Sequence, residues 1–208
     1  MPPNLRPSNL ARINSNPFMK KYLPRSLAGL FLAAALVGGV ITNALSQPNT
    51  KAISLFNGRD LTGWGYKTNN FDGKMSSIDG RYSAKDGILT VNPGKGLAQL
   101  WTTREFPNDF VLTLEFRADV NADSGIFLRK PQLQCRDYLV AGPYKALKKY
   151  KPQDWNEIVV TVKNGVAHCT CNGEVLEAAL ALPATGPIGL EADRGQMEYR
   201  NLLLRPTP

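Results

Sequence analysis

Apolar and polar residues alternate most regularly between residues 110 and 117. Phenylalanine and leucine occupy every second position there, and Val, Thr, Glu and Arg occupy the positions between them. Side chains on one face of a β-strand recur with a period of two, so this pattern predicts a strand with one buried face. The residues expected to face the core are Phe110, Leu112, Leu114 and Phe116.

Two Asn-Gly pairs, Asn164-Gly165 and Asn172-Gly173, lie in a segment rich in Val, Ile and Thr. Asn-Gly between strand-like residues is a strong signal for a two-residue hairpin, because a type I′ turn requires a positive φ at both central residues. The segment therefore predicts a three-stranded antiparallel meander over residues 158–163, 166–171 and 174–178.

Other short segments with strand character follow one another along the chain, separated by Gly, Pro, Asn and Asp. They are residues 53–56, 87–91, 97–102, 125–129, 133–137, 186–192 and 196–205. No stretch resembles an amphipathic helix longer than about two turns. Many short strands with frequent turn residues are typical of a β-sandwich. The sequence thus predicts an all-β protein in which two antiparallel sheets pack together.

The first 50 residues have a different composition. Residues 1–25 contain five basic and no acidic residues, and residues 26–50 carry no charge. The apolar run at 27–41 is shorter than the roughly 20 residues that span a bilayer, and it suits the apolar region of a signal peptide. Small residues at 44 and 46 favour cleavage before Gln47.

We therefore interpret residues 1–46 as a signal peptide or an N-terminal membrane anchor, residues 47–51 as a linker, and residues 52–206 as one domain. The protein is expected to be exported to the periplasm or the extracellular space. If cleavage does not occur, residues 27–45 are the expected anchor, and no other part of the chain is expected to contact a membrane.

Removal of residues 1–46 changes the charge balance. Five of the 25 Lys and Arg residues lie there, so residues 47–208 carry 20 basic against 17 acidic residues, or about +3. The basic run at 145–151 has no accompanying nucleic-acid motif, and we expect no nucleic-acid partner. The oligomeric state is left open.

The cysteines favour a structural interpretation. Cys169 and Cys171 are two residues apart on one predicted strand, and the sequence contains no second close pair that would complete a zinc site. Small buried thiols are the simpler interpretation, and a disulfide from Cys135 to one of them stays open in an oxidising compartment. His168 falls on the opposite face of that strand and is interpreted as structural.

Six segments together resemble one known family in their order and spacing. They are FNGRDLTGW (56–64), DFVLTLEFR (109–117), DSGIFLR (123–129), WNEIVVTV (155–162), CNGEVL (171–176) and GPIGLEAD with MEYRNLLLRP (186–206). Through them the sequence resembles the 3-keto-disaccharide hydrolase family over about residues 52–206. The resemblance implies a concanavalin A-like jelly roll, in agreement with the strand pattern, and a glycoside or oligosaccharide ligand. Trp64 and Trp155 are interpreted as core or corner residues, with sugar stacking as the alternative.

The resemblance also implies a reaction, the cleavage of a 3-keto-glucoside by elimination and hydration. A ketone at C3 acidifies the proton on C2, so that a base removes it, the C1 substituent leaves, and water adds to the unsaturated sugar. Such a site needs a base and a donor for the enolate oxygen. The candidate catalytic residues are Asp137, Glu191 and Asp193, and the candidate substrate-binding residues are Arg129, Gln132, Gln134, Tyr144 and Lys145.

We expect Arg129, Gln134, Asp137, Glu191 and Asp193 to converge on one concave surface. Strand alternation puts Gln132 and Gln134 on one face and Asp137 on the other, so Asp137 needs loop geometry to join them. No cofactor is evident, a divalent metal ion is left open, and no metal ligands are assigned.

Two positions depart from the family pattern, which usually has Asn where Asp123 stands and Glu where Gln132 stands. An amide neither accepts a proton near neutral pH nor carries charge, so Gln132 cannot replace a catalytic carboxylate. The alternative to an enzyme is therefore a non-catalytic carbohydrate-binding or surface-interaction module.

Overall fold

The computed structural model describes residues 51–208. The predicted signal peptide or anchor and the linker up to residue 50 lie outside the described residues, so their interpretation stays a prediction. Residues 51–208 contain fourteen strands and no helix. In this part of the chain no segment is a long apolar helix of the kind that crosses a membrane.

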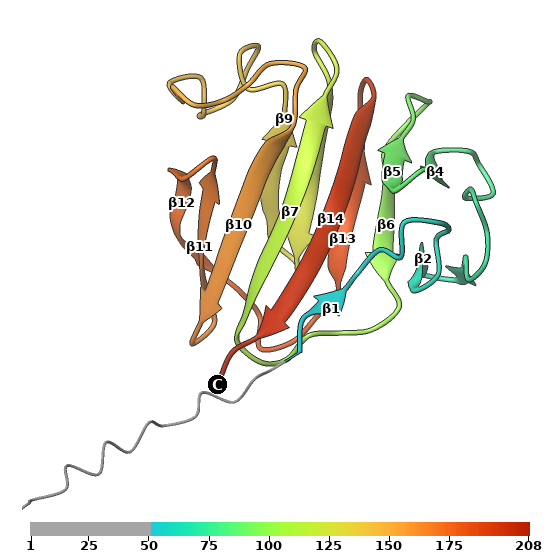
Figure 1. Ribbon diagram of the computed structural model, residues 1–208, viewed down its shortest axis with the longest axis horizontal. Helices are drawn as coiled ribbons and strands as arrows, with labels where there is room; N and C mark the ends of the chain where they lie inside the picture. The colour runs from blue at the N-terminus through green and yellow to red at the C-terminus, as the bar shows by residue number, and fades with distance from the viewer. Residues whose placement is uncertain (1–50) are drawn as a thin grey trace, which may run out of the picture. The chain divides into compact units, whose positions relative to one another are not determined.

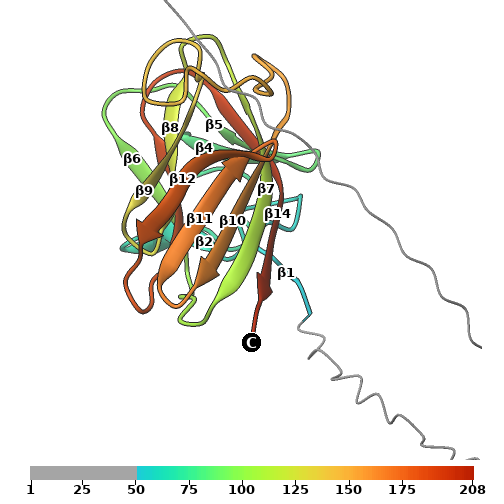
Figure 2. The same ribbon diagram turned by 90° about the vertical axis from the view of Figure 1, so that its left-hand side faces the viewer.

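The strands form two antiparallel sheets, as the sequence predicts, and the sheets pack face to face as a jelly-roll sandwich (Figures 1 and 2). The eight-stranded sheet has the order β12 (Glu174–Ala181), β11 (Val166–Cys171), β10 (Asn156–Lys163), β7 (Phe110–Ala118), β14 (Met197–Pro206), β5 (Ile88–Val91) and β4 (Tyr82–Lys85), and β1 (Ile53–Ser54) also pairs with β14. The six-stranded sheet has the order β3 (Asn69–Asn70), β2 (Trp64–Tyr66), β6 (Ala98–Thr102), β13 (Ile188–Ala192), β8 (Asp123–Leu128) and β9 (Gln132–Arg136).

The core lies between the sheets and follows the predicted alternation. All four residues expected to face inward on β7 are buried, with at most 1% of each exposed. Ile126, Leu133 and Leu190 approach them from the six-stranded sheet and are fully buried. Burial of alternate residues on both sheets is the main stabilising contribution of this architecture.

The predicted meander is correct in both turns. Asn164 and Gly165 have φ values of 51° and 74°, and Asn172 and Gly173 have values of 48° and 80°, as a type I′ turn requires. The three strands that these turns join are β10, β11 and β12.

All three cysteines are buried free thiols, so the open disulfide pairing does not occur in this structure. Burial raises the pKa values of Cys169 and Cys171 to about 12, which keeps both thiols protonated and unreactive near neutral pH. His168 is exposed, as expected for the opposite face of β11.

Strands β2, β3 and β4 were not predicted, because they are two to four residues long and rich in Gly, Asn and Ser. The two tryptophans differ from each other. Trp64 is a core residue whose indole N–H donates to the Leu55 carbonyl at 2.6 Å. Trp155 is only partly buried and is not in the core, and the guanidinium groups of Arg117 and Arg200 lie 4.8 and 4.0 Å from its ring centre.

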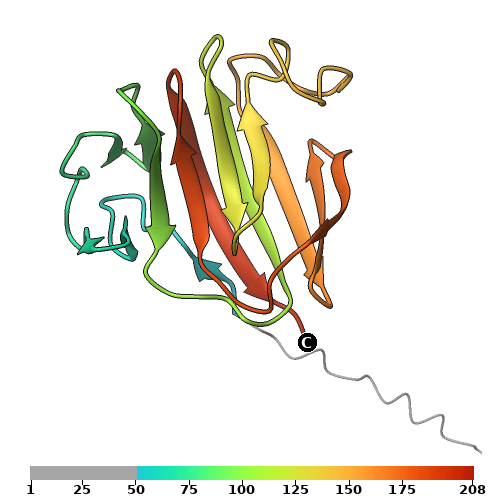
Figure 3. The same ribbon diagram turned by 180° about the vertical axis from the view of Figure 1, so that it is seen from behind.

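The outer face of the six-stranded sheet is the part of this fold that carries the candidate site. In the view from behind, this sheet lies in front, with β6 in green, β13 in red and β8 and β9 in yellow (Figure 3). One face of these strands packs against the core, so every second residue points away from it.

Candidate functional site

An aromatic row crosses the outer face of the six-stranded sheet. In the strand register Trp101 of β6 lies between Gly65 of β2 and Gly189 of β13, and Gly189 is followed by Phe127 of β8. The rings of Trp101 and Phe127 are 4.9 Å apart with 32° between their planes. A methyl group on Gly189 would come within 2.6 Å of the Trp101 ring, so the glycine lets this ring lie flat against the sheet.

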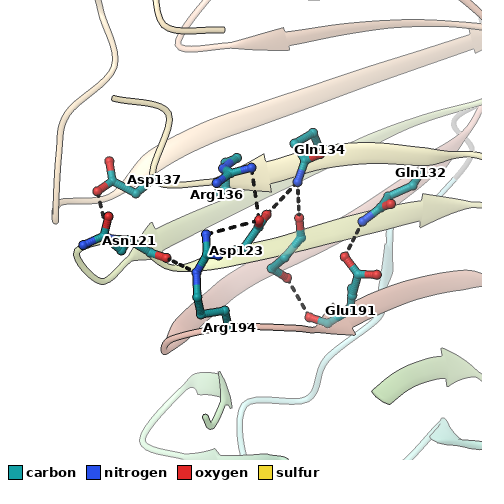
Figure 4. A network of polar contacts seen from close by, with 9 residues as sticks. Asn121, Asp123, Gln132, Gln134, Arg136, Asp137, Glu191 and Arg194 are labelled. Carbon is teal, nitrogen blue, oxygen red and sulfur yellow. Dashed lines mark hydrogen bonds and ion pairs between the residues drawn. The ribbon is translucent and has the colours of Figure 1, made fainter. Parts of the chain in front are cut away.

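A polar row runs beside the aromatic row. Glu191 of β13 lies opposite Gln99 of β6, and the side chain of Gln132 reaches across β8 from the edge strand β9 to donate a hydrogen bond to the Glu191 carboxylate (Figure 4). This path exists because Gly125 lies below it, and a methyl group there would overlap the Gln132 amide. Side chains opposite one another in antiparallel strands have Cβ atoms roughly 5 Å apart, so Gln99 and Glu191 can contact one ligand.

The pKa of the Glu191 carboxyl is shifted upward from its ordinary value. Burial is the main cause, because it disfavours the charged form. The nearby negative charges of Asp193 and Asp123 act in the same direction, while the hydrogen bond from Gln132 opposes the shift. A partly buried carboxylate with a raised pKa beside other polar side chains is a candidate general base.

Buried hydroxyl groups hold the backbone that carries Glu191. Ser124 of β8 donates to the Glu191 carbonyl at 2.6 Å and lies 2.9 Å from the Tyr199 hydroxyl. Tyr82 donates to the Leu190 carbonyl at 2.8 Å. These contacts come from both sheets and fix the position of β13 relative to the core.

A second carboxylate, Asp123, is held in an ion-pair network at the end of β8 (Figure 4). Its oxygens lie 3.0 Å from the Arg136 guanidinium and 3.5 Å from that of Arg194. Gln134 donates to Asp123 at 2.8 Å and to the Ser124 carbonyl at 3.1 Å. Asp123 is therefore held by two arginines, and it serves to position Gln134 beside the polar row.

A cavity of about 510 Å³ opens beside the aromatic row, and we call it the aromatic hollow. It is lined by Gly65, Tyr66, Lys67, Gln99, Trp101, Thr102, Thr103, Phe127, Arg129, Lys130 and Pro187. Lys67, Gln99 and Trp101 also line a second cavity of about 380 Å³. Gln99 joins the aromatic hollow to the polar row, because it lies opposite Glu191.

The predicted residues that the structure brings together are Gln132, Gln134, Glu191 and Asp193. Asp193 continues the outward alternation of β13 two residues after Glu191 and influences its pKa. Gln132 and Gln134 belong to β9, Glu191 belongs to β13, and Asp193 follows β13 directly. The two strands are far apart in the sequence, and β8 lies between them in the sheet.

Asp137 does not join them. It is buried at the end of β9, where its carboxylate accepts hydrogen bonds from the backbone N–H groups of Asn121 and Leu139 and from the side chains of Tyr150 and Gln153 at 3.2–3.4 Å. The alternation of β9 turns it away from the outer face, and the loop does not bring it back. Its role in this structure is to hold two loop segments.

Arg129 lines the aromatic hollow, but its guanidinium is used elsewhere. It donates to the carbonyls of Asn108 and Pro183 at 2.6 and 2.8 Å and lies over the Phe110 ring. Arg129 has a φ of 65°, and this left-handed backbone conformation accompanies the change in side-chain direction at the end of β8.

Tyr144 and Lys145 lie in the loop between β9 and β10. The Tyr144 hydroxyl donates to Glu177 of β12 at 2.5 Å, and its ring packs against Tyr138 at 5.3 Å. These contacts tie the loop to the eight-stranded sheet and do not involve the polar row. Lys145 is exposed beside Tyr144.

Sequence reasoning missed Gln99, Trp101 and Phe127. Trp101 alternates with the buried Leu100 and Thr102, and this alternation is the signal that places it on the outer face. Phe127 lies between Ile126 and Leu128 in a continuous apolar run, where no alternation is visible. Among residues 51–208, no group of three or more His, Cys, Asp or Glu residues is arranged to hold a metal ion. Whether the protein uses a divalent ion therefore stays open.

The comparisons with known proteins agree with a carbohydrate-related jelly roll. Residues 51–205 match the family described as the 3-keto-alpha-glucoside-1,2-lyase-like domain. Two solved structures from Parabacteroides distasonis ATCC 8503, both provisionally named glycosyl hydrolases, are similar in fold. The first is 16% identical in sequence, and the aligned region covers 76% of this chain and 95% of that structure's chain, with a TM-score of 0.59. The second is 19% identical in sequence, and the aligned region covers 75% of this chain and 99% of that structure's chain, with a TM-score of 0.56. No curated protein matches the sequence.

Proposed function

The chain belongs to the 3-keto-alpha-glucoside-1,2-lyase-like family, and from this premise we propose that it cleaves the glycosidic bond of a 3-keto-glucoside by elimination followed by hydration. The outer face of the six-stranded sheet is the proposed active site. Glu191 removes the C2 proton, and the electron pair of the C2–H bond forms a C2=C3 double bond, so that the C3 oxygen carries the negative charge of an enolate. The C3 ketone then re-forms, the released electron pair forms the C1=C2 double bond, and the electron pair of the C1–O bond leaves with the aglycone oxygen, which takes a proton from water. Water then adds across the double bond to give the free 3-keto sugar.

The observation that carries this proposal is the environment of Glu191. Its pKa is raised by burial, and a single amide donor, Gln132, orients the carboxylate. A base of this kind binds a proton more readily than an exposed carboxylate, which favours abstraction of the C2 proton. The carboxylate of Asp137 is instead occupied by four hydrogen bonds, so Glu191 is the better candidate.

Amide groups supply the donors that the enolate oxygen needs. The side chain of Gln99 is exposed, lies opposite Glu191, and makes no hydrogen bond to the residues that the structure describes. Gln132 orients Glu191 and does not itself act as a base. The family usually has Glu where this chain has Gln132. This difference is compatible with catalysis, because the proposed base, Glu191, comes from β13.

The decisive experiment is aglycone release from a 3-keto-α-glucoside by the purified protein, with and without chelator. The Glu191→Gln variant is expected to lower turnover by roughly 10²- to 10⁴-fold with a small change in binding, as the loss of a general base does. The amide at 191 still accepts a hydrogen bond from Gln132, so the fold is expected to persist. Asp193→Asn is the matched control, because it removes a carboxylate from the same strand end and is expected to change turnover by less than about tenfold.

Unchanged release by Glu191→Gln would refute the assignment of the base. If the unmodified protein releases no aglycone from a 3-keto-glucoside but retains the sugar on a column, the carbohydrate-binding module is the correct function. Loss of release on addition of chelator, restored by a divalent cation, would add a metal ion to the mechanism.

Export remains part of the proposal. It is supported by the apolar run at 27–41 and the preceding basic residues. A periplasmic or extracellular location would give the protein access to glycosides before uptake.

A further inference from the structure

We infer that the aromatic hollow receives an aromatic aglycone, so that the preferred substrate is an aryl 3-keto-glucoside and not a disaccharide. This inference rests on the proposed function, since it names the leaving group of the same reaction. In this arrangement the sugar lies over the polar row, and the aglycone extends from C1 over Trp101 and Phe127.

The surface chemistry of the aromatic hollow suits a flat apolar ring. Trp101 and Phe127 are tilted by only 32°, so they offer adjoining faces, and Pro187 adds a further apolar surface. Aromatic rings in such contact attract one another beyond the gain from burying their area. A volume of about 510 Å³ exceeds that of a single phenyl ring and lies within the range of small-molecule sites.

The polar side chains that line the hollow supply few free acceptors for a second sugar, and Gln99 is the one side-chain amide among them. The hydroxyls of Tyr66, Thr102 and Thr103 each donate to another residue, Asp79, Arg104 and Gly63 respectively. These three hydroxyls and the Nη1 and Nη2 atoms of Arg129 are thus engaged, the Nε atom of Arg129 is buried without a hydrogen-bond partner among the described residues, and no carboxylate lines the cavity. A sugar ring carries several hydroxyl donors, and burying them beside so few free acceptors is costly. A phenyl ring has no such groups.

Two lysines give the hollow a positive charge that matches a phenolic leaving group. Lys67 and Lys130 both line it and are exposed, and within residues 51–208 neither has an acidic side chain at ion-pair distance. Elimination places the electron pair of the C1–O bond on the aglycone oxygen. With a phenol the product is a phenolate, which an ammonium group stabilises before a proton from water neutralises it.

The test separates binding from catalysis. Binding of phenyl α-glucoside and methyl α-glucoside is measured by titration calorimetry, and release is measured with the corresponding 3-keto-glucosides and with a 3-keto-disaccharide. We expect the phenyl ligand to bind at least about tenfold more tightly than the methyl ligand, as expected for an additional stacked ring. Its 3-keto form is expected to show the highest kcat/KM of the three.

Variants locate the effect. Trp101→Leu is expected to reduce the phenyl preference to less than about threefold, and Trp155→Leu, on the opposite sheet, is expected to leave it unchanged. Lys130→Gln changes an exposed side chain without affecting packing. It is expected to lower kcat/KM for the phenyl substrate several-fold more than for the methyl substrate.

The outcomes distinguish the two proposals. Release without preference among phenyl, methyl and disaccharide substrates would overturn the aromatic aglycone and leave the proposed function standing. No release from any substrate, together with preferred binding of the phenyl ligand that depends on Trp101, would refute the proposed function and support the aromatic occupant. Equal binding of the two ligands would overturn the inference whatever the release assay gives. If Trp101→Leu fails to fold, Phe127→Leu and Lys130→Gln carry the same comparison.

Discussion

Replacement of Leu114 by alanine is the sharpest test of the sandwich core. Leu114 is in the middle of β7, opposite Ile158 of β10, and only 1% of it is exposed. The strand lies between β10 and β14, with its β14 pairs at Thr113 and Glu115 on either side of Leu114, so the backbone has little freedom to collapse into a cavity. A substitution here therefore reports on packing at the centre of the larger sheet.

The expected cost follows from the atoms removed. Leucine to alanine deletes three carbon atoms, and at about 0.8 kcal/mol for each buried methylene the transfer cost is about 2.4 kcal/mol. The cavity left in a well-paired sheet raises this to about 3–4 kcal/mol, inside the roughly 2–5 kcal/mol seen for buried leucines. The free energy of unfolding in water should fall by this amount.

Urea unfolding followed by tryptophan fluorescence measures this difference. Thr113→Ala is the matched control, because Thr113 is the neighbouring residue on the outer face of the same strand, and its cost should stay below about 1 kcal/mol. The slope of the unfolding free energy with urea should be the same in all three proteins. A loss for Leu114→Ala of less than about 1.5 kcal/mol would refute the assignment of β7 to the centre of the core.

Four further outcomes are expected. In the same urea assay, Asn172→Ala should destabilise the protein more than Asn164→Ala. Both turns need a positive φ, but only the side-chain amide of Asn172 also forms hydrogen bonds, to Lys149, Asn156 and Glu157. Equal losses of unfolding free energy would contradict this. The raised pKa of Glu191 means that its basic form is lost as the pH falls through a value above the ordinary 4.5, so the acidic limb of kcat/KM should lie above that pH. Gln132→Leu removes the hydrogen bond that lowers this pKa and should move the limb to higher pH, whereas an unmoved limb would show that another group titrates. Mass spectrometry of the exported protein should find Gln47 as the first residue, and a chain that retains residues 1–46 would favour the anchor.

The sequence by itself determined the fold class and most of its strands. Alternation from residue 110 to 117 specifies which face of β7 is buried, because period-two burial is a local property of an extended chain. The two Asn-Gly pairs specify hairpins for a similar reason, since few other residues adopt the required backbone angles without strain. Where local patterns were weak, as in the short strands β2, β3 and β4, the prediction failed.

The candidate site was only partly visible in the sequence. Gln132, Gln134 and Glu191 were named from the family resemblance, and alternation correctly put Asp137 on the other face of β9. Arg129 and Tyr144 were named as substrate-binding residues, but the tertiary structure directs their polar groups to carbonyl and carboxylate partners far away in the sequence.

Only the tertiary structure decided which residues share a surface. The order of β6, β13, β8 and β9 brings Trp101, Glu191, Phe127 and Gln132 side by side, although up to 90 positions of sequence separate them. Two glycines then decide the directions of the side chains, because Gly189 lets the Trp101 ring lie flat and Gly125 lets Gln132 reach Glu191. Strand order and cross-strand contacts of this kind depend on the global packing of both sheets, and no local sequence pattern encodes them.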